Sequence, residues 1–364
     1  MTGREKEILE LIKKNPLISQ KEIGETLNIT RSSVGVHITN LIKKGYIRGR
    51  GYVMNKTDYV TVVGAANLDI QGFTKEKLIQ RDSNPGEVKI CLGGVGRNIA
   101  ENMARLGIDT KLITATGGDA NSKRLLEECN QVGIDMEHVL VLPDANASVY
   151  LAIMDVDGDM AMALSDMHIM DRMTIEFIKG KSHVLKNSEV IVVDACVPED
   201  VIAYILHTFK DSKILLDPVS IKKSRGVKDM IGGFHTIKLN RLEAQFLSDM
   251  TIQNHDDLPK LAQYFIDEGV ERVFITLGSD GVYYKDRRQG GLLASPKIKV
   301  VNATGAGDAF MAGIIHGTLY DEPTVEIAKF STAAAILALQ HQETVSPHMQ
   351  ADTIHKIVKE MTIC

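Results

Sequence analysis

Apolar side chains in the first 56 residues recur at the spacing of three short amphipathic helices. Residues 8–12 form the stripe of a first helix, the capping-box sequence 19–22 opens a second, and Thr30 caps a third that ends at Gly45. Residues 46–53 alternate around glycines, as a small hairpin does. Three helices and a hairpin are typical of a winged helix-turn-helix, which we expect over residues 1–56. The side chains expected to point inward on the third helix are Val34, Ile38, Leu41 and Ile42.

From residue 57 to residue 364, short apolar runs alternate with amphipathic segments. We predict buried strands at residues 60–63, 112–115, 190–194, 214–217, 236–239 and 273–277. We predict helices near residues 98–106, 198–209, 242–248, 257–268, 309–319 and 325–339. This alternation indicates a three-layer α/β/α domain, a mostly parallel sheet with helices on both faces. Ligands of such sheets gather at the carboxyl ends of the strands.

Two stretches, at about residues 70–91 and 147–165, interrupt the α/β pattern with β-ribbon sequences. In the second, residues 156–159 are a hairpin signal. The acidic string 155–159 also resembles a calcium loop, but its glycine is at the fourth position rather than the sixth, so we interpret it as a turn. We expect the two ribbons to form a small β-sheet lid whose exposed face pairs with a second subunit in a homodimer.

The composition is that of a globular protein, with 44% hydrophobic and 24% charged residues. The chain has neither an apolar run long enough for a membrane span nor a signal-peptide core at its N-terminus, so we expect a cytoplasmic protein that does not engage membranes. Its four cysteines are scattered and its histidines form no ligand pair. We therefore expect neither disulfides nor a zinc site.

Charge is distributed unevenly along the chain. Residues 1–56 carry eleven Lys and Arg against five Asp and Glu, whereas the remainder carries 31 against 42. A basic head on an acidic body suggests that the head binds double-stranded DNA; a helical domain for protein contacts is the alternative. The side chains expected to face DNA are Arg31, Ser32, Ser33, His37 and Asn40 on the third helix, and Arg48 and Arg50 on the wing.

Residues 302–308, Asn-Ala-Thr-Gly-Ala-Gly-Asp, directly precede an apolar, small-residue helix. Backbone amides at a helix N-terminus attract anions through unsatisfied donors and the helix dipole. Phosphoryl transfer explains why a carboxylate follows such a pocket. In this reaction the amides hold the phosphoryl group, and Asp308 takes the proton of an attacking hydroxyl. A glycine turn with Asp308 as a helix cap is the alternative.

A second glycine cluster, residues 93–100, opens the helix near residues 98–106. Together with residues 302–308 it resembles the paired signatures of the ribokinase-type (PfkB) sugar and nucleoside kinases, over residues 59 to about 361. The resemblance implies a ribokinase-like fold, ATP as phosphoryl donor and Mg²⁺ as cofactor. Residues 93–101, 217–220 and Asn302 are most similar to pseudouridine kinases within that family.

The resemblance also implies roles for individual residues. Asp308 is the expected catalytic base, and the amides of Gly305, Ala306 and Gly307 form the anion hole. Glu243 holds Mg²⁺ through water. The residues expected to bind the sugar are Asn67, Asp69, Gly93, Gly94 and Asn98. The residues expected to bind ATP are Asn240, Thr276, Gly278, Gly281 and Thr304, with Gly305 and Gly307.

Arg97 and Asn302 depart from the common family pattern. Arg97 could face the nucleobase, the phosphoryl group or a lid carboxylate such as Asp166, or form a structural salt bridge. Many relatives bind a monovalent cation with an aspartate where this chain has Asn302. Activation by K⁺ through Asn302, Thr304 and the loop 340–346 therefore stays open.

Three functions remain as hypotheses. The first is an ATP-dependent pseudouridine kinase, forming the 5′-monophosphate, with a DNA-binding head that links it to gene regulation. The second is an ATP-dependent kinase whose substrate is ribose, another pentose or a purine nucleoside such as adenosine. The third is a transcriptional repressor whose kinase-like body only senses a sugar. The presence of a base, an anion hole and a metal motif together favours catalysis.

Overall fold

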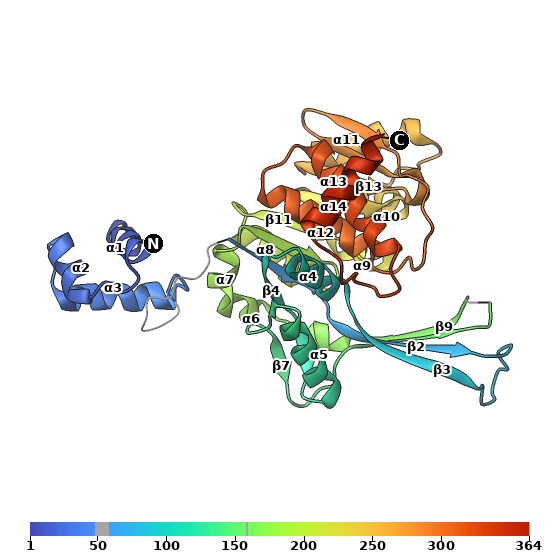
Figure 1. Cartoon of the computed structure of the whole chain (residues 1–364), viewed down its shortest axis with the longest axis horizontal. Coiled ribbons are helices and arrows are strands. Elements are labelled where there is room, and N and C mark those ends of the chain that lie inside the picture. Colours follow the sequence, from blue (N-terminus) through green and yellow to red (C-terminus); the bar gives the residue numbers. More distant parts are fainter. Residues whose placement is uncertain (48–57, 158, 364) are drawn as a thin grey trace. The chain divides into compact units, whose positions relative to one another are not determined.

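The computed structural model describes residues 1–47, 58–157 and 159–363. Its contacts define two compact units, Met1–Asp58 with Lys181–Ser188, and Tyr59–Gly180 with Glu189–Cys364. The first contains α1 (Gly3–Lys14), α2 (Gln20–Leu27) and α3 (Arg31–Lys43), and the short α7 (Ser182–Lys186) groups with it. We describe each unit by itself (Figure 1).

The three N-terminal helices begin where their cap residues predict. Ser19 and Glu22 form a reciprocal capping box on α2, and the Thr30 hydroxyl accepts a hydrogen bond from the Ser33 amide at the start of α3. Val34, Ile38 and Leu41 are buried together with Ile8, Ile12 and Ile23. The inward placement of Ile42 was wrong, because it lies at the margin of the stripe and is 43% exposed. The predicted wing residues Arg48 and Arg50 lie outside the described residues.

Nine strands of the described residues form the central sheet, in the order β15-β14-β13-β12-β11-β10-β1-β4-β6. Its strands are β1 (Tyr59–Val63), β4 (Asp109–Ile113), β6 (Ile134–Asp135), β10 (Val190–Asp194), β11 (Lys213–Asp217), β12 (Thr236–Asn240), β13 (Arg272–Thr276), β14 (Val282–Asp286) and β15 (Gly290–Leu293). Within the seven strands from β13 to β6 in this order, neighbours pair in parallel. Strand β14 is antiparallel to both of its neighbours, β13 and β15. The carboxyl ends of the parallel strands therefore meet at one edge.

Helices cover both faces of this sheet. On one face, α4 (Val95–Arg105), α5 (Ala120–Gln131), α12 (Ala306–Leu319) and α13 (Thr324–Leu339) share an apolar core with alternate strand residues such as Val60 and Val62. On the other, α10 (Arg241–Ser248) and α11 (Leu258–Glu268) contact β12 and β13 without contributing to that core. The remaining α-helices of the unit are α6 (Ile175–Gly180), α8 (Glu199–Thr208), α9 (Ile221–Ser224) and α14 (Ala351–Ile363). The α/β prediction is confirmed.

A second sheet forms the lid. Its strands lie in the order β3 (Gly86–Gly93), β2 (Asn67–Thr74), β8 (Val149–Met154) and β9 (Met160–Asp166), and they project from the kinase-like unit (Figure 1). Asp155 accepts hydrogen bonds from the amides of Asp157 and Asp159, so the acidic string is a turn. A short pair, β5 (Ala115–Gly117) and β7 (Leu140–Leu142), lies apart from both sheets. None of the helices in the described residues has the length and apolar character of a membrane span.

The register of the lid separates its two faces. Val88, Gly72, Ile153 and Met162 lie in one row across the sheet, and Ile90, Ile70, Leu151 and Leu164 in the next. The opposite face carries Gln71 and Lys89, whose row includes Ala152. One face of the lid is therefore apolar, and the other mixes polar residues such as Gln71 and Lys89 with Phe73 and Met154; we call it the polar face.

Candidate active site

Asp308 lies in the first turn of α12, at the carboxyl edge of the sheet. Gly305 precedes this helix with a φ of 83°, and a Cβ there would lie 2.1 Å from the Thr344 carbonyl oxygen, so only glycine fits. The amides that follow, in residues 306–308, belong to the first helical turn and have no partner within the helix. The predicted anion hole is thus a helix N-terminus beside a carboxylate.

The carboxylate of Asp308 is buried. Asn98, on α4, donates from Nδ2 to Asp308 Oδ2 at 2.7 Å. Burial, with a smaller contribution from Asp217, raises the pKa of Asp308 to about 7. A carboxylate with such a pKa can hold or release a proton near neutral pH, which is what a general base requires.

A buried ion pair lies against the anion hole. Lys238, on β12, donates from Nζ to Asp217 Oδ2 at 2.7 Å. A Cβ on Gly307 would lie 3.1 Å from Lys238 Nζ, so the ammonium group faces the backbone of the helix start. Burial opposes the charge of Lys238, but nearby carboxylates, Asp217 first among them, outweigh it and raise its pKa.

Sequence reasoning missed this lysine. The available signal was a charged residue inside an apolar strand, two positions before Asn240. Sequence reasoning also missed the role of Asp194, at the end of β10, which accepts hydrogen bonds from the amides of Ala65, Gly96 and Cys196 at 2.8–2.9 Å. Burial raises the pKa of Asp194 to about 6. Its hydrogen bonds fix the turn after β1 against the start of α4.

The residues predicted to bind sugar lie together at the base of the lid. Asn67 and Gly93 are paired across β2 and β3, and Asn67 Nδ2 donates to Asp69 Oδ1 at 2.6 Å. Burial raises the pKa of Asp69. Gly94 starts α4, which carries Asn98 to the Asp308 carboxylate. A hydroxyl-rich ligand here would meet two amides and two carboxylates.

Arg97 is buried and points along its own helix. Its Nη1 donates to Glu101 Oε2 at 2.6 Å and its Nε to Asn98 Oδ1 at 3.1 Å. Asp166 is exposed at the end of β9, and no contact joins it to Arg97 among the described residues. Of the alternatives that the sequence left open, the structure shows the salt bridge.

A cavity of about 1240 Å³ opens between the polar face of the lid and the kinase-like body. Its lining includes Gln71, Phe73 and Lys89 from the lid, and Arg97, Asn302 and Thr304 from the body. This volume exceeds that of a nucleoside, and a concave site with convergent polar groups is where ligands usually bind. Thr304, which directly precedes the predicted anion hole, and Leu92, which directly precedes Gly93, also line it. Asp308, Asn67 and Asp69 are not among the described residues that line it.

Comparison with known proteins assigns this architecture. The model described as pfkB family carbohydrate kinase matches residues 57–351, and a winged helix-turn-helix DNA-binding model matches residues 1–48. The chain belongs to the pfkB family of carbohydrate kinases. It is an ATP-dependent sugar or nucleoside kinase with an N-terminal winged helix-turn-helix.

Individual relatives agree with this assignment. The chain is 37% identical to the pseudouridine kinase of Escherichia coli (strain K12), over 84% of this chain and 98% of the relative. It is 32% identical to an uncharacterized sugar kinase, YeiI, of the same strain, over 98% of this chain and 99% of the relative. The structure of Arabidopsis thaliana ribokinase complexed with ribose and ATP superposes with a TM-score of 0.72 at 19% identity, over 83% of this chain and 98% of that chain. The last comparison confirms the ribokinase-like fold.

The metal motif predicted for this pfkB kinase forms a helix cap. Asn240 and Glu243 form a reciprocal capping box on α10, in which Glu243 Oε2 accepts from the Asn240 amide at 2.8 Å. Glu243 is buried, and burial raises its pKa. A carboxylate at this edge fits Mg²⁺ held through water, because Mg²⁺ needs few protein ligands when phosphates supply the rest.

The predicted nucleotide-binding turn follows β13. Thr276 donates to the Leu239 carbonyl oxygen at 3.3 Å. Gly278 and Gly281 have φ angles of 63° and 101°, which side-chain-bearing residues rarely adopt. The turn lies at the same carboxyl edge as Asn240, with which Thr276 is paired in the sheet.

Asn302 joins two loops of the kinase. Its Oδ1 accepts from the Thr304 amide and its Nδ2 donates to the Gln342 carbonyl oxygen, both at 2.9 Å. A cation at this position would need oxygen atoms, whereas the amide group of Asn302 presents a donor to a carbonyl that could serve as a ligand. The residues present therefore do not fit a monovalent cation at Asn302.

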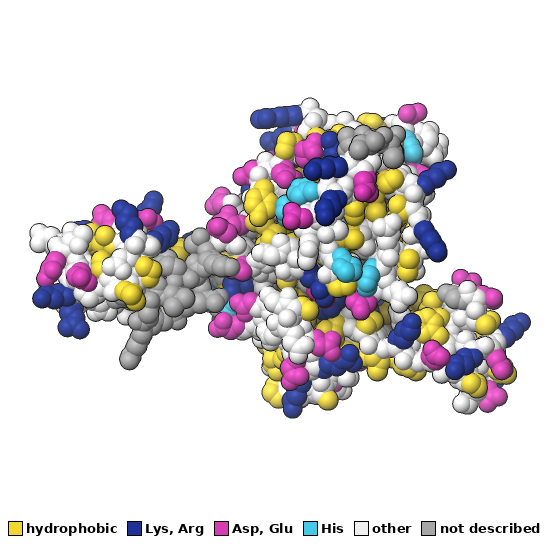
Figure 2. Space-filling model, in the orientation of Figure 1, with side chains coloured by type: hydrophobic (Ala, Val, Ile, Leu, Met, Phe, Trp, Pro, Cys, Tyr) yellow, Lys and Arg dark blue, Asp and Glu magenta, His cyan; other side chains and the backbone are white. Residues whose placement is uncertain are grey.

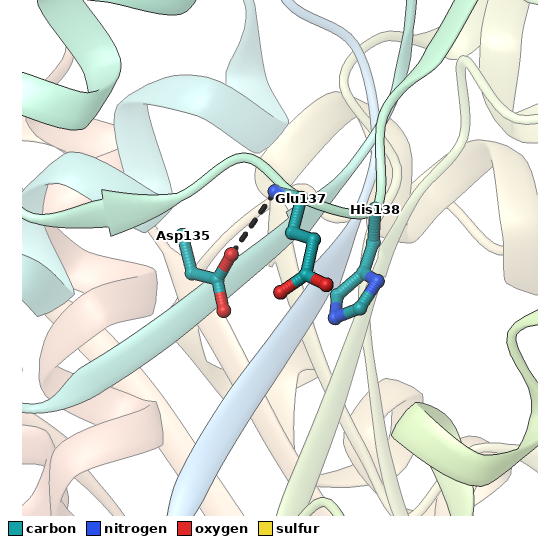
Figure 3. Close-up of side chains that lie close together, drawn as sticks. All are labelled: Asp135, Glu137 and His138. Carbon is teal, nitrogen blue, oxygen red and sulfur yellow. Dashed lines mark hydrogen bonds between the residues drawn. The ribbon is translucent and has the colours of Figure 1, made fainter. Parts of the chain in front are cut away.

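A separate cluster follows β6, where ligand atoms of Asp135, Glu137 and His138 lie within 4.8 Å of one another (Figure 3). Asp135 Oδ1 already accepts from the Glu137 amide at 3.0 Å, and its other oxygen accepts from the ammonium group of Lys111. The positive charge facing Asp135 is thus supplied by the chain itself, and we assign this cluster no metal-binding role.

The described residues of the winged helix-turn-helix place the predicted DNA-binding side chains on α3. Arg31 and Ser32 are exposed, and Ser33, His37 and Asn40 are half-buried. The hydroxyls of Ser32 and Ser33 lie within 3.0 Å of the capping Thr30 hydroxyl, so they are partly engaged in the helix start. Lys and Arg side chains are prominent on the visible surface of this unit (Figure 2).

Proposed function

We propose that this kinase transfers the γ-phosphoryl group of ATP to the 5′-hydroxyl of pseudouridine. The observation that carries the proposal is the buried Asp308, with its pKa near 7, in the first turn of a helix whose preceding loop, at Thr304, lines a cleft large enough for a nucleoside. The 37% identity to a pseudouridine kinase, across nearly all of that relative, supports the choice of substrate. The products are ADP and pseudouridine 5′-phosphate.

Each group has a defined part in this reaction. Asp308 accepts the proton of the 5′-hydroxyl as its oxygen forms a bond to the γ-phosphorus and the bond to the bridging oxygen of ADP breaks. The amides of residues 305–307 and the ammonium of Lys238 stabilise the charge on the transferring group. Mg²⁺, when bound near Glu243, neutralises phosphate charge. Asn67 and Asp69 hold the ribose hydroxyls.

Pseudouridine differs from uridine in its C-glycosidic bond, which leaves N1–H as an additional donor. A buried acceptor for this donor would reject uridine, because uridine would leave the acceptor unpaired. Gln71, on β2 and on the polar face of the lid, offers an acceptor oxygen in the lining of the cleft. It is the group proposed to pair with the N1–H of the base.

A substrate panel tests the proposal. ATP consumption is measured with pseudouridine, uridine, cytidine, adenosine and ribose, at equal enzyme concentration. We expect kcat/KM for pseudouridine to exceed that for uridine by at least ~10²-fold. More efficient phosphorylation of ribose or adenosine would refute the substrate while leaving the kinase activity intact.

We also propose that the winged helix-turn-helix binds double-stranded DNA and that the kinase is a homodimer. The basic composition of residues 1–56 and the exposed Arg31 support DNA binding. The apolar lid face supports a second copy of the chain as the partner, because Val88, Ile90, Met162 and Leu164 are 47–68% exposed there. The described base, anion hole and metal motif disfavour a body that only senses a ligand.

A further inference from the structure

A continuous chain of hydrogen bonds runs through α4 to the carboxylate of Asp308. Glu101 accepts from Arg97 at 2.6 Å, Arg97 donates to Asn98 Oδ1 from both Nε and Nη2, and Asn98 donates to Asp308 at 2.7 Å. Arg97, Asn98 and Glu101 are 5–7% exposed. The chain is thus largely shielded from water, although Arg97 also borders the cleft.

The chemistry of the side chains fixes the direction of this chain. A guanidinium group has donors only, so the amide oxygen of Asn98 must face Arg97. The amide nitrogen must then face Asp308, although oxygen and nitrogen have nearly the same shape and could otherwise exchange. With the opposite orientation, Asn98 would place an acceptor against a carboxylate.

We propose that Arg97 is a positioning residue, which Glu101 holds so that Asn98 presents its donor to the catalytic carboxylate. The inference rests on the proposed role of Asp308 as the base. The hydrogen bond from Asn98 occupies Asp308 Oδ2 and leaves Oδ1 to receive the proton of the substrate hydroxyl. Arg97 acts through Asn98 and need not touch the nucleoside.

The groups that face Asp308 predict how its pKa changes when Arg97 is replaced. Asp217 on β11 disfavours the ionised form, whereas Lys238 on β12 and the Arg97–Asn98 pair on α4 favour it. Loss of Arg97 therefore raises the pKa of Asp308. Because the base must be ionised, the acidic limb of the kcat/KM profile should move to higher pH.

Arg105 provides a matched control, because it borders the same cleft as Arg97. It donates to Glu101 Oε1 at 2.6 and 2.8 Å, from the next turn of α4, and has no hydrogen bond to Asn98 among those described. Arg97→Met and Arg105→Met each remove one of the two guanidinium groups on Glu101 and leave it paired with the other. Only Arg97→Met releases the oxygen of Asn98.

The experiment compares the pH profiles of both variants with pseudouridine and ATP, after thermal unfolding has shown that both fold. We expect Arg97→Met to lower kcat by about 10- to 10²-fold, as misplacement of a reacting group does, and to shift the acidic limb upward. The KM for pseudouridine should change far less than kcat. Arg105→Met should keep the kcat and the acidic limb of the wild type.

The alternative outcomes separate the possible roles of Arg97. If Arg97→Met behaves like Arg105→Met, the ion pair is structural and the inference fails. If it raises the KM or alters the preference for pseudouridine over uridine with the acidic limb unmoved, Arg97 binds substrate and the inference also fails. If Arg97→Met does not fold, Arg97→Lys tests the same point. This variant keeps the positive charge but loses the two-pronged contact with Asn98. It should therefore lower kcat with little movement of the acidic limb of the kcat/KM profile.

The result can be distinguished from failure of the proposed base. Full activity of Asp308→Asn would remove the base and the inference together. An inactive Asp308→Asn, with matching profiles for Arg97→Met and Arg105→Met, would remove only the inference.

Discussion

Asp308 is placed where burial opposes its negative charge, and its proposed role as the base explains that placement. Its neighbours compensate in part, because Asn98 and Lys238 favour the ionised form. The resulting pKa of about 7 allows the carboxylate to take a proton at neutral pH and lose it afterwards. Because burial opposes the negative charge, ionisation of Asp308 lowers the free energy of unfolding.

Replacement of Asp308 should separate catalysis from binding. We expect Asp308→Asn to lower kcat by roughly 10²–10⁴-fold, the range for loss of a general base, while ATP and the nucleoside still bind. Steady-state kinetics and calorimetric titration measure the two effects. Near-normal kcat in a folded variant would remove Asp308 from the role of base.

The same variant should be more stable than the wild type at alkaline pH. The pKa of Asp308 is raised on folding, from the ordinary 3.8 to about 7, so the folded state binds the proton more tightly than the unfolded chain. The contribution of Asp308 to wild-type stability is therefore fully present below the ordinary pKa and is lost as the pH rises through about 7. The substituted asparagine side chain cannot ionise, so the variant should unfold on the order of 5 °C higher at about pH 8 and at the same temperature at about pH 4. Equal melting temperatures at both pH values would contradict the raised pKa.

The amide group of Asn302 predicts that the enzyme does not respond to monovalent cations. Its amide group already bridges Thr304 and Gln342, so the wild-type activity should be the same in K⁺, Na⁺ and a bulky organic cation at equal ionic strength. Asn302→Asp exchanges the donor for an oxygen and adds a negative charge. We expect this variant to be activated by K⁺, on the order of severalfold, because an oxygen ligand set then becomes available. K⁺ dependence of the wild type would overturn this interpretation.

At the scale of elements, the two faces of the lid differ in composition and in what lies against them. The polar face borders the cleft, and the apolar face exposes four large side chains in two adjacent rows. Yellow patches on the lid are visible in Figure 2. A monomeric protein rarely leaves a flat apolar sheet face in water, so a second copy of the lid is its expected cover.

Charges on the apolar lid face should abolish the dimer. Met162→Lys and Leu164→Lys together place two ammonium groups in the expected interface, whereas Val156→Lys, in the turn after β8, changes an equally exposed apolar residue outside it. Light scattering at micromolar concentration should show a dimer for the wild type and Val156→Lys, and a monomer for the double variant. A monomeric wild type would count against the lid as an interface.

Much of the fold could be predicted because the apolar runs of buried parallel strands are continuous. The strand predicted at residues 190–194 is β10 to the residue, and those predicted at 60–63, 214–217, 236–239 and 273–277 lie within one residue of β1, β11, β12 and β13. The strand predicted at 112–115 overlaps β4 only at its last two residues and runs on into β5. Helix α5 was not predicted, because it lies at the edge of the core and buries only Ser122, Leu125 and Cys129. Its polar sequence carries too weak an apolar stripe for periodicity to identify.

At the scale of the whole molecule, residues proposed to act within one sequence motif could be named from the sequence, whereas contacts made by tertiary packing could not. The anion hole and the metal motif are each continuous in sequence. The contact of Lys238 with Asp217 depends on the register of β12 beside β11, where Ile237 pairs with Leu216. The contact of Asn98 with Asp308 depends on how α4 approaches α12. Register and helix approach are properties of the folded chain that spacing alone does not contain.

The whole molecule joins a kinase and a winged helix-turn-helix in one chain. The wing predicted from the sequence carries Arg48 and Arg50, and each should neutralise one phosphate if the domain binds as winged helix-turn-helix proteins do. We expect Arg48→Ala with Arg50→Ala to weaken binding of a mixed-sequence duplex and to reduce the slope of log K against log salt by up to about two units. Arg4→Ala is the control, because Arg4 is exposed on α1 and already paired with Glu7 at 2.7 Å. Fluorescence anisotropy over a range of salt concentrations measures both slopes. An unchanged slope in the double variant would mean that the wing does not contact phosphates, and no binding of the full chain at any salt concentration would remove the proposed role in gene regulation.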